Sequence, residues 1–181
     1  IGKVKVVEGD IIDNNSLLNL GDKFDVVFHL AAYVHKTPKS DDEKKYVFAV
    51  NVEGTKNLLE SLSDSVGNIV FFSSVSVYGN DMGRNLDEDT STNPTTLYGK
   101  TKLSAEQLVI DYGNKHKFKT TILRLPLVYG PGNKGNIYNM IKAIYNRRFV
   151  MMGRGRNKRS MVYVGNVVDA AMAVLNTEVS D

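Results

Sequence analysis

Two nearly continuous apolar runs constrain the fold of this chain more than any other feature of its sequence. Residues 25–32 (DVVFHLAA) and 68–74 (NIVFFSS) place apolar side chains at successive positions instead of alternate ones. A strand with this pattern is buried on both of its faces, which is typical of the interior of a parallel sheet. The two runs therefore predict strands that helices cover on both sides.

Helical patterns separate these strands along the chain. Apolar positions three or four residues apart predict one helix over 42–62, with Gly54 as the candidate for a bend in it, and another over 97–112. The alternation predicts an α/β fold, a Rossmann-like, doubly wound and mainly parallel sheet with helices on both faces. The other expected elements are a helical turn at 16–20, strands at 4–7, 120–125 and 161–164, and helices at 137–145 and 166–175.

Polar and small residues follow several of these strands. Asp10, Ala31, Ala32, Ser74 and Leu127 each stand at or just after the end of a predicted strand. In open parallel sheets, ligands bind at the edge formed by the carboxyl ends of the strands. We therefore expect the functional site at this edge.

The composition excludes several classes of protein. With 181 residues and 42% hydrophobic content, the chain can bury an ample core, and its net charge of +3 is too small to favour a nucleic-acid partner. There is no cysteine and there are only three scattered histidines, so neither a disulfide framework nor a metal site is expected. No apolar run approaches the ~20 residues of a membrane span, and no signal peptide precedes the first predicted strand. These features predict a soluble, cytoplasmic protein with no membrane partner.

Tyr98 and Lys102 have a spacing that suits acid–base chemistry. On a helix over 97–112 they stand at i and i+4, so their side chains lie on one face. A phenol with a pKa near ~10 is a poor base at neutral pH, and a neighbouring ammonium favours the phenolate. A serine such as Ser74 can share the transferring proton and orient a substrate oxygen. The same spacing also occurs where an exposed lysine stem packs over a ring, so other motifs must decide.

Five motifs in a fixed order carry a resemblance to a known family. They resemble the extended short-chain dehydrogenases, and more narrowly the NAD-dependent epimerase/dehydratase family that acts on nucleotide sugars and includes UDP-glucose 4-epimerases. Each motif is weak alone, but together they cover nearly the whole chain. The motifs are HLAA at 29–32, NVEGT at 51–55, SSVSVYG at 73–79, YGKTK at 98–102 and LRLPLVYGPG at 123–132.

The resemblance implies roles for individual residues. Tyr98 would be the catalytic acid and base, Lys102 would bind the nicotinamide ribose and lower the pKa of the tyrosine, and Ser74 would hydrogen-bond the reacting sugar oxygen. The implied cofactor is NAD, with NADP left open. The residues implied to bind it are Asp10, Ile11, Leu30, Ala31, Ala32, Asn51, Tyr98 and Lys102. The residues implied to bind substrate are Ser74, Ser76, Leu127, Asn136 and Arg159.

Two of these residues have alternative explanations. Asn51 could instead bridge neighbouring backbone, and Arg159 could be one of several solvated charges. If Arg159 does grip a diphosphate, its guanidinium would bind the phosphate oxygens bidentately.

The sequence also departs from the family pattern. No counterpart of the family's first strand–helix–strand unit with its glycine-rich loop is found, so we expect the chain to begin at the family's third strand and to be truncated at both ends. Residues 130–135 (GPGNKG) match G-x-G-x-x-G literally, but Pro131 removes an N–H from a motif that works through N–H donors. We therefore expect 1–130 to be a partial NAD(P)-binding domain. Residues 131–181 are then a partial substrate-binding region interleaved with the last Rossmann elements.

For the parent protein, these inferences favour a nucleotide-sugar 4-epimerase whose substrate is UDP-linked. Without the glycine-rich loop, the present chain alone is expected to bind NAD poorly and to be inactive. Dehydration is disfavoured because Val75 and Ser76 stand where dehydratases carry acidic residues. A 4-ketoreductase or dehydrogenase remains the alternative, since it needs the same residues. An alternative of another class is a non-catalytic fragment that dimerises. Either way, a homodimer is expected through the helices around 42–62 and 97–112.

Overall fold

The computed structural model describes residues 4–18, 20, 23–34, 37–62, 66–79, 85–133, 135–151, 153–156 and 158–176. The chain divides into two compact units, Ile1–Arg124 and Leu125–Asp181, which are described separately.

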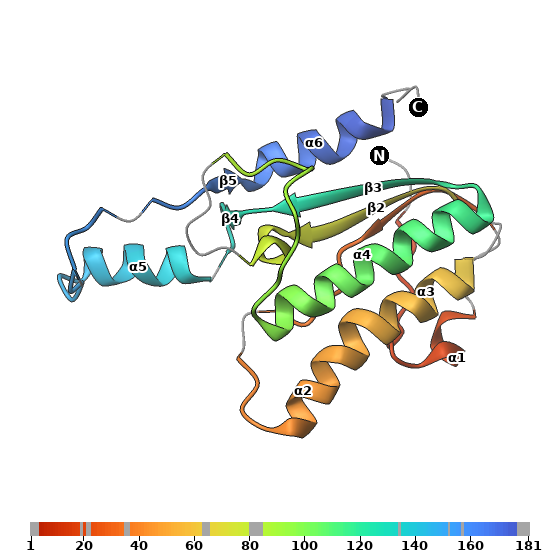
Figure 1. Cartoon of the computed structure of the whole chain (residues 1–181), viewed down its shortest axis with the longest axis horizontal. Helices are drawn as coiled ribbons and strands as arrows, with labels where there is room; N and C mark the ends of the chain where they lie inside the picture. Colours follow the sequence, from red (N-terminus) through yellow and green to blue (C-terminus); the bar gives the residue numbers. More distant parts are fainter. Residues whose placement is uncertain are drawn as a thin grey trace. The chain divides into compact units, whose positions relative to one another are not determined.

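A parallel sheet forms the centre of the first unit. Its strand order is β1-β2-β3, and β1 pairs in parallel with β2 from Phe24 opposite Val66 to His29 opposite Phe71. The arrow of β3 points the same way as that of β2 in Figure 1. The carboxyl ends of the strands therefore lie at one edge, as the apolar runs predicted. The strands are β1 (Phe24–His29), β2 (Val66–Ser74) and β3 (Lys119–Leu125).

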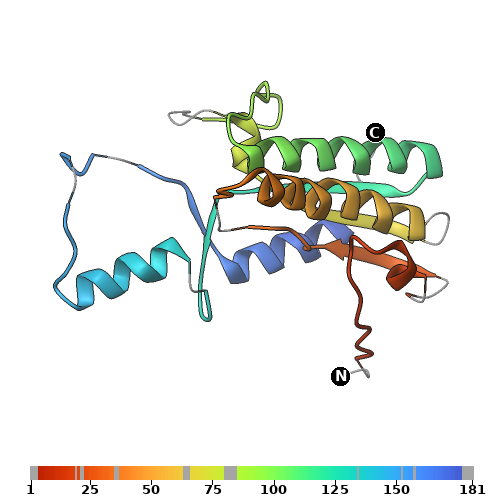
Figure 2. The ribbon, with the colours of Figure 1, turned by 90° about the horizontal axis from the view of Figure 1, so that it is seen from below.

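One helical run, formed by α2, η1 and α3, lies beside the helix α4 on one face of this sheet (Figures 1 and 2). The predicted helix over 42–62 is a continuous helical run in which a π-helical turn, η1, ends directly before Gly54. The side chain of Thr96 caps α4 (Leu97–His116) by accepting a hydrogen bond from the N–H of Gly99 at 3.0 Å. The helical elements of the unit are α1 (Asn14–Leu17), α2 (Asp41–Phe48), η1 (Ala49–Glu53), α3 (Gly54–Leu62), the 3-10 helix η3 (Val75–Tyr78) and α4 (Leu97–His116).

The core joins β2 to α3 and α4. Phe71, Ala105 and Val109 are completely buried, and Leu59 and Ile69 are 1% exposed. Truncating a residue of this kind to alanine typically costs a few kcal/mol, because the lost transfer energy is compounded by a cavity. The end of β2 and the start of α4 are therefore carried by a rigid scaffold.

The predicted strand at 4–7 is wrong. Residues 4–10 have no regular secondary structure, and Val4 and Val6 are 85% and 87% exposed. A strand needs a neighbour to satisfy its N–H and C=O groups. No strand in the described part of the chain pairs with this segment. Its β-branched composition alone is therefore not sufficient to form a strand.

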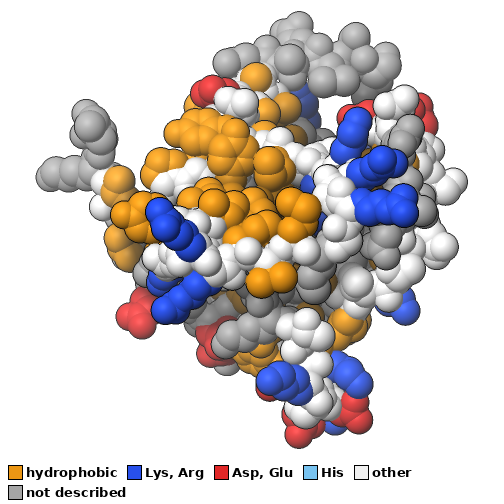
Figure 3. Space-filling view, turned by 90° about the vertical axis from the view of Figure 1, so that its left-hand side faces the viewer, with side chains coloured by type: hydrophobic (Ala, Val, Ile, Leu, Met, Phe, Trp, Pro, Cys, Tyr) orange, Lys and Arg blue, Asp and Glu red, His pale blue; other side chains and the backbone are white. Residues whose placement is uncertain are grey.

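The second unit contains a smaller parallel pair of strands. Leu127 lies opposite Met161 and Tyr129 opposite Tyr163. The sequence pattern does not predict the strand at 127–129, because Pro126 ends the predicted strand at 120–125. Figure 3 shows hydrophobic side chains gathered on one face of the molecule. At the end of α5 and in the segment after it, Tyr145 is 86% and Val150 78% exposed. The elements are β4 (Leu127–Tyr129), α5 (Asn136–Tyr145), β5 (Met161–Tyr163) and α6 (Val164–Asn176).

Candidate active site

Three predicted site residues meet where β2 ends. The hydroxyl of Ser74 accepts a hydrogen bond from the N–H of Ser76 at 3.2 Å and donates one to the hydroxyl of Ser76 at 3.1 Å, so it caps η3. The side chain of Tyr98, at the start of α4, lies close enough to that of Ser74 to affect the pKa of the phenol. The phenol and both hydroxyls therefore form one polar cluster at the carboxyl end of the central strand.

Gly99 allows this approach. A β-carbon at Gly99 would lie 2.5 Å from the carbonyl oxygen of Ser76. Any other residue would push the first turn of α4 away from η3, and Tyr98 would move with it. Glycine is thus required here by packing between two elements that both belong to the site.

The phenol of Tyr98 is held in its protonated form. Burial raises its pKa because it disfavours the phenolate, and the interaction with Ser74, which is the smaller effect, lowers it. Sequence reasoning predicted that Lys102 would lower this pKa. In this arrangement the Lys102 ammonium lies 4.0 Å from the centre of the Phe71 ring instead, and no effect of Lys102 on Tyr98 is resolved.

Lys102 is a buried cation one helical turn from Tyr98. Only 2% of it is exposed, and burial lowers its pKa from 10.5 to about 8, against the opposing effect of Glu106. Contact with the face of an aromatic ring stabilises an ammonium, which partly replaces its lost hydration. A lysine of this kind is ready to bind polar oxygen atoms, because its charge is poorly compensated by solvent.

A chain of neutral hydrogen bonds fixes the end of β1. The Thr55 hydroxyl donates to the carbonyl oxygen of Asn51 at 2.8 Å, so it must accept the bond that joins it to Nε2 of His29 at 2.8 Å. Nε2 of His29 therefore carries a hydrogen and donates it to the Thr55 hydroxyl, and the neutral imidazole is sufficient for this bond. Burial, and secondarily the charge of Lys102, lowers the pKa of His29 from 6.5 to about 4.

Asn51 holds the loop after β1 against α4. Its Oδ1 accepts a hydrogen bond from the N–H of Tyr33 at 2.7 Å, while its Nδ2 donates to the hydroxyl of Thr101 at 3.0 Å and to the carbonyl of Tyr33 at 3.4 Å. Asn51 is 2% exposed. The π-helical turn places it there. Its side chain bridges the backbone as the alternative explanation stated, and its predicted contact with NAD stays a prediction.

A groove of about 350 Å³ lies along the end of β1, and several predicted cofactor residues line it. Ile11, Leu30 and Ala31 are among its lining residues. The turn that carries Asp10 and Ile11 is anchored, because Asn57 donates hydrogen bonds to the carbonyls of Ile11 and Ile12 at 3.1 and 3.2 Å. The Asp10 carboxylate accepts from the N–H of Ile12 at 3.0 Å. Ala32 follows in the same loop, outside the groove lining.

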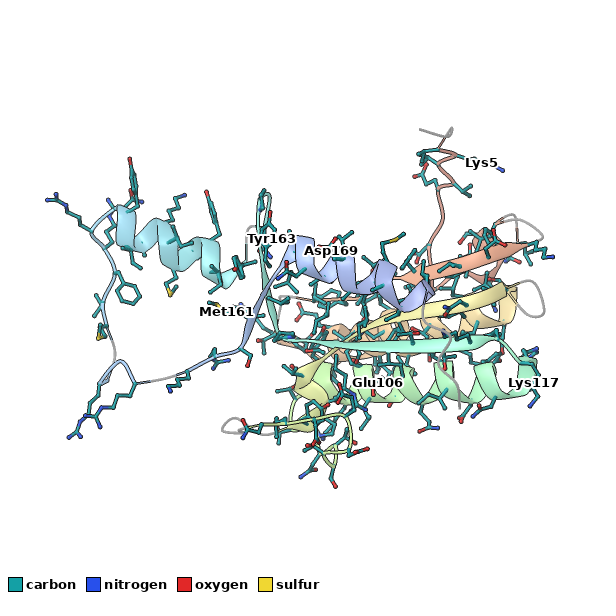
Figure 4. The ribbon with its side chains drawn as sticks, turned by 90° about the horizontal axis from the view of Figure 1, so that it is seen from above. Lys5, Glu106, Lys117, Met161, Tyr163 and Asp169 are labelled. Carbon is teal, nitrogen blue, oxygen red and sulfur yellow. The ribbon has the colours of Figure 1, made fainter. Side chains whose placement is uncertain are left out.

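Sequence reasoning missed an ion pair behind the serines. Arg124 in β3 contacts Glu106 of α4 through Nη2 at 2.9 Å, and Ser73 donates a hydrogen bond to the same carboxylate. Figure 4 shows Glu106 on the side of α4 that faces the strands. The available signal was the spacing, because Glu106 follows Lys102 by four residues and Tyr98 by eight, and a lone charge interrupts the apolar strand at Arg124.

The remaining predicted residues belong to the second unit. Leu127 lies in β4, Arg159 is exposed just before β5, and Asn136 begins α5 with a side chain outside the described part of the structure. Their substrate contacts stay predictions. This part of the sequence is strongly basic, since no aspartate or glutamate occurs between Asp111 and Asp169.

Two further observations bear on the type of site. Among the described residues, no group of three or more histidine, aspartate or glutamate side chains is arranged to hold a metal ion. No helix in the described ranges has the length and apolar character needed to span a bilayer.

A parallel sheet with helices, carrying serine, tyrosine and lysine at the carboxyl edge, defines a Rossmann-like protein of the short-chain dehydrogenase type. The chain belongs to the NAD dependent epimerase/dehydratase family, whose pattern matches residues 1–181. Both the family resemblance and the predicted fold class are thereby confirmed.

Curated and solved relatives agree with this membership. The chain is 40% identical over 164 residues to N-acetyl-alpha-D-glucosaminyl-diphospho-ditrans,octacis-undecaprenol 4-epimerase of Escherichia coli O157:H7, covering 89% of this chain and 48% of the relative. It is 32% identical to mouse dTDP-D-glucose 4,6-dehydratase, with 94% and 50% covered. The UDP-glucuronic acid 4-epimerase of Bacillus cereus, solved with NAD, superposes with a TM-score of 0.81 at 29% identity, with 93% and 54% covered. The chain thus spans about half the length of these relatives.

Proposed function

We propose that the protein is an NAD-dependent nucleotide-sugar 4-epimerase. The observation that carries the proposal is the cluster of Ser74, Ser76 and Tyr98 at the carboxyl end of β2, with Lys102 one turn further along α4. Two relatives that are named as 4-epimerases support the proposal, one from Escherichia coli O157:H7 and the other the solved enzyme of Bacillus cereus.

Tyr98 and Ser74 have different roles in the proposed reaction. Tyr98 would take the proton of the sugar C4 hydroxyl as the phenolate, a form that the ammonium of Lys102 would have to favour against the effect of burial, and Ser74 would hold that oxygen. Bound NAD would supply the hydride acceptor. After the 4-keto sugar turns its other face, the same phenol returns the proton as hydride returns to C4. A 4-ketoreductase would use the same residues in one direction, so this alternative stays open.

The cofactor residues fit an adenine and a ribose. The groove lined by Ile11, Leu30 and Ala31 offers an apolar wall for the adenine. Lys102 is 2% exposed and does not line this groove, so its ammonium would have to become accessible when NAD binds in order to donate to the ribose hydroxyls. Asn51 would act indirectly by holding Tyr33 and the loop after β1. Asp10 would help by shaping the turn that carries Ile11. NADP is not distinguished from NAD by these residues.

The substrate would carry a diphosphate. Exposed Arg159 and the absence of acidic residues from 112 to 168 suit an anionic group. UDP is the first candidate carrier, since the solved relative was also determined with UDP-glucuronic acid and NAD. A polyprenyl diphosphate is the second, because the relative at 40% identity has such a substrate in its name. Leu127 and Asn136 would contact the sugar or its carrier.

The assembly and location are proposed as well. We expect a cytoplasmic homodimer that pairs the helices around 42–62 and 97–112, where Tyr46 is 50% and Phe48 44% exposed. Sedimentation equilibrium would give twice the chain mass. A monomer at all concentrations would exclude the dimer, and a dimer that binds no NAD would favour the non-catalytic alternative.

A conversion assay tests the reaction. The purified full-length parent protein is incubated with NAD and, in parallel, with UDP-glucose, UDP-glucuronic acid, UDP-N-acetylglucosamine and the N-acetylglucosaminyl diphosphate of a polyprenol. Proton NMR of the sugar then identifies the C4 epimer. Epimer formation supports the proposal, and its carrier separates the two substrate classes. Net reduction of a 4-keto sugar without epimerisation would identify a reductase, and no reaction in any arm would refute the proposal.

A further inference from the structure

The buried face of α4 carries a carboxylate that the proposed reaction does not use. Tyr98, Lys102 and Glu106 follow one another at four-residue intervals and share one stripe of the helix. Glu106 is 2% exposed, although no substrate or cofactor role falls to it. A buried carboxylate without compensation is strongly unfavourable, so its partners must matter.

These partners come from both neighbouring strands. Ser73 of β2 donates a hydrogen bond to Oε1 of Glu106. Arg124 of β3 donates through Nη2 to Oε2 at 2.9 Å and through Nε to both carboxylate oxygens at 3.2 Å. The remaining end of the guanidinium, Nη1, donates to the hydroxyl of Tyr78 at 3.1 Å.

This network encloses Ser74 on both sides along the chain. Ser73 precedes it, and Tyr78 ends the 3-10 helix that Ser74 caps. Both are held by the Glu106–Arg124 pair, and Glu106 lies on the same helix as Tyr98. We infer that the Glu106–Arg124 pair sets the position of α4 along β2, and thereby places the phenol of Tyr98 against the hydroxyl of Ser74. The inference rests on the proposed function for its effect on turnover.

A bidentate pair is suited to this task. Charge-assisted hydrogen bonds between a guanidinium and a carboxylate are effective over a narrow range of distance and direction. Apolar contacts such as those of Val109 tolerate sliding, because dispersion and burial have little directional preference. A displacement of about 1 Å at reacting groups can cost on the order of a hundredfold in rate. Glu106 and Arg124 are therefore positioning residues, not catalytic ones.

Three conservative variants separate positioning from simple stabilisation. Arg124→Lys keeps the positive charge but loses the bidentate hydrogen bonding of the guanidinium. Glu106→Gln keeps the shape of the side chain but loses its charge. Tyr78→Phe removes the hydrogen bond to Nη1 of Arg124 and leaves the ion pair intact. We expect kcat to fall at least ~10-fold in the first two and ~2-fold to 3-fold in the third, with KM for NAD and sugar within ~2-fold of wild type. Asp111→Asn, an exposed change of equal chemistry on the same helix, should leave kcat unchanged.

A second readout needs no turnover. With carbon-13 in the tyrosine rings and Tyr98→Phe to assign the signal, NMR titration follows the phenol directly. The interaction with Ser74 lowers the pKa of Tyr98, so its loss in Arg124→Lys or Glu106→Gln should move the titration to higher pH. Folded variants with wild-type kcat, KM and titration, and only a lower Tm, would overturn the inference. A wild-type protein without turnover would refute the proposed function alone, and the titration would then decide the inference.

Discussion

Two hydrogen-bond networks anchor α4, and they differ in charge. The network of Ser73, Glu106 and Arg124 is ionic and joins the middle of the helix to β2 and β3. The network of His29, Thr55 and Asn51 is neutral and, through Thr101, joins the start of the helix to the end of β1. The ionic network stands behind the proposed catalytic residues, whereas the neutral one stands behind the proposed cofactor loop.

One helix can thus support a proposed catalytic site and a proposed cofactor site through interactions of different charge. A charged pair gives strong and directional restraint, which a proton-transfer geometry needs. A neutral network near a cofactor avoids an additional fixed charge, but it depends on His29 staying unprotonated. The two networks should therefore fail under different conditions, which makes the comparison testable.

The largest effect is expected from leaving Glu106 without its partner. Arg124→Met should destabilise the protein by about 3–5 kcal/mol, because a carboxylate that is 2% exposed would remain unpaired. Urea denaturation followed by circular dichroism measures this loss. The double variant Arg124→Met with Glu106→Met should recover at least half of it, since a buried pair can be replaced by apolar side chains. A double variant no more stable than the single one would show that the network matters by packing alone.

A slightly smaller effect is expected from acid. His29 has a pKa of about 4 in the folded protein and 6.5 as its ordinary value, so the unfolded chain binds more protons between these values. Stability is thus fully present above pH 6.5 and falls by ~3 kcal/mol as the pH drops toward 4. Denaturation curves across this range measure the slope. The part of the slope due to His29 should vanish in His29→Gln, and an identical slope in that variant would contradict this assignment.

Removing the amide of Asn51 should have the smallest effect. Asn51→Ala leaves the N–H of Tyr33 without its side-chain acceptor and should cost about 2 kcal/mol. Hydrogen exchange should increase first in the loop at 30–34, while the middle of α4 stays protected. Asn114→Ala, at an exposed position of α4, is the matched control. Equal exchange in both variants would mean that Asn51 does not hold the loop.

The sequence predicted those helices and strands whose formation depends mainly on the pattern of neighbouring residues. The apolar runs located β1 and β2, and helical spacing located α4, because burial on two faces or one stripe is encoded in neighbouring residues. Residues 4–7 look like a strand, but strand formation also needs a partner, which the segment itself does not specify. The segment after Pro126 forms β4 because β5, more than thirty residues later, lies beside it.

The candidate site likewise contains features that the sequence predicted and features that it did not. The rule on strand ends predicted Ser74 at the carboxyl edge of the sheet, and the family resemblance implied that Tyr98 acts beside it. The ion pair between Glu106 and Arg124 joins residues on different elements, and nothing in either local pattern indicates the other. The ammonium of Lys102 lies over Phe71 because the core places that ring there, which the spacing of Tyr98 and Lys102 alone could not reveal.

The rate of Tyr98→Phe tests the central claim most directly. The variant removes only the phenolic oxygen, and Tyr46→Phe, on the half-exposed ring of α2, is its matched control. With the sugar nucleotide that the wild-type protein epimerises, Tyr98→Phe should lose at least ~100-fold in kcat, the low end of what general acid–base catalysis contributes, while Tyr46→Phe keeps the wild-type rate. A folded Tyr98→Phe variant that epimerises as fast as wild type would contradict the assignment of this cluster as the active site.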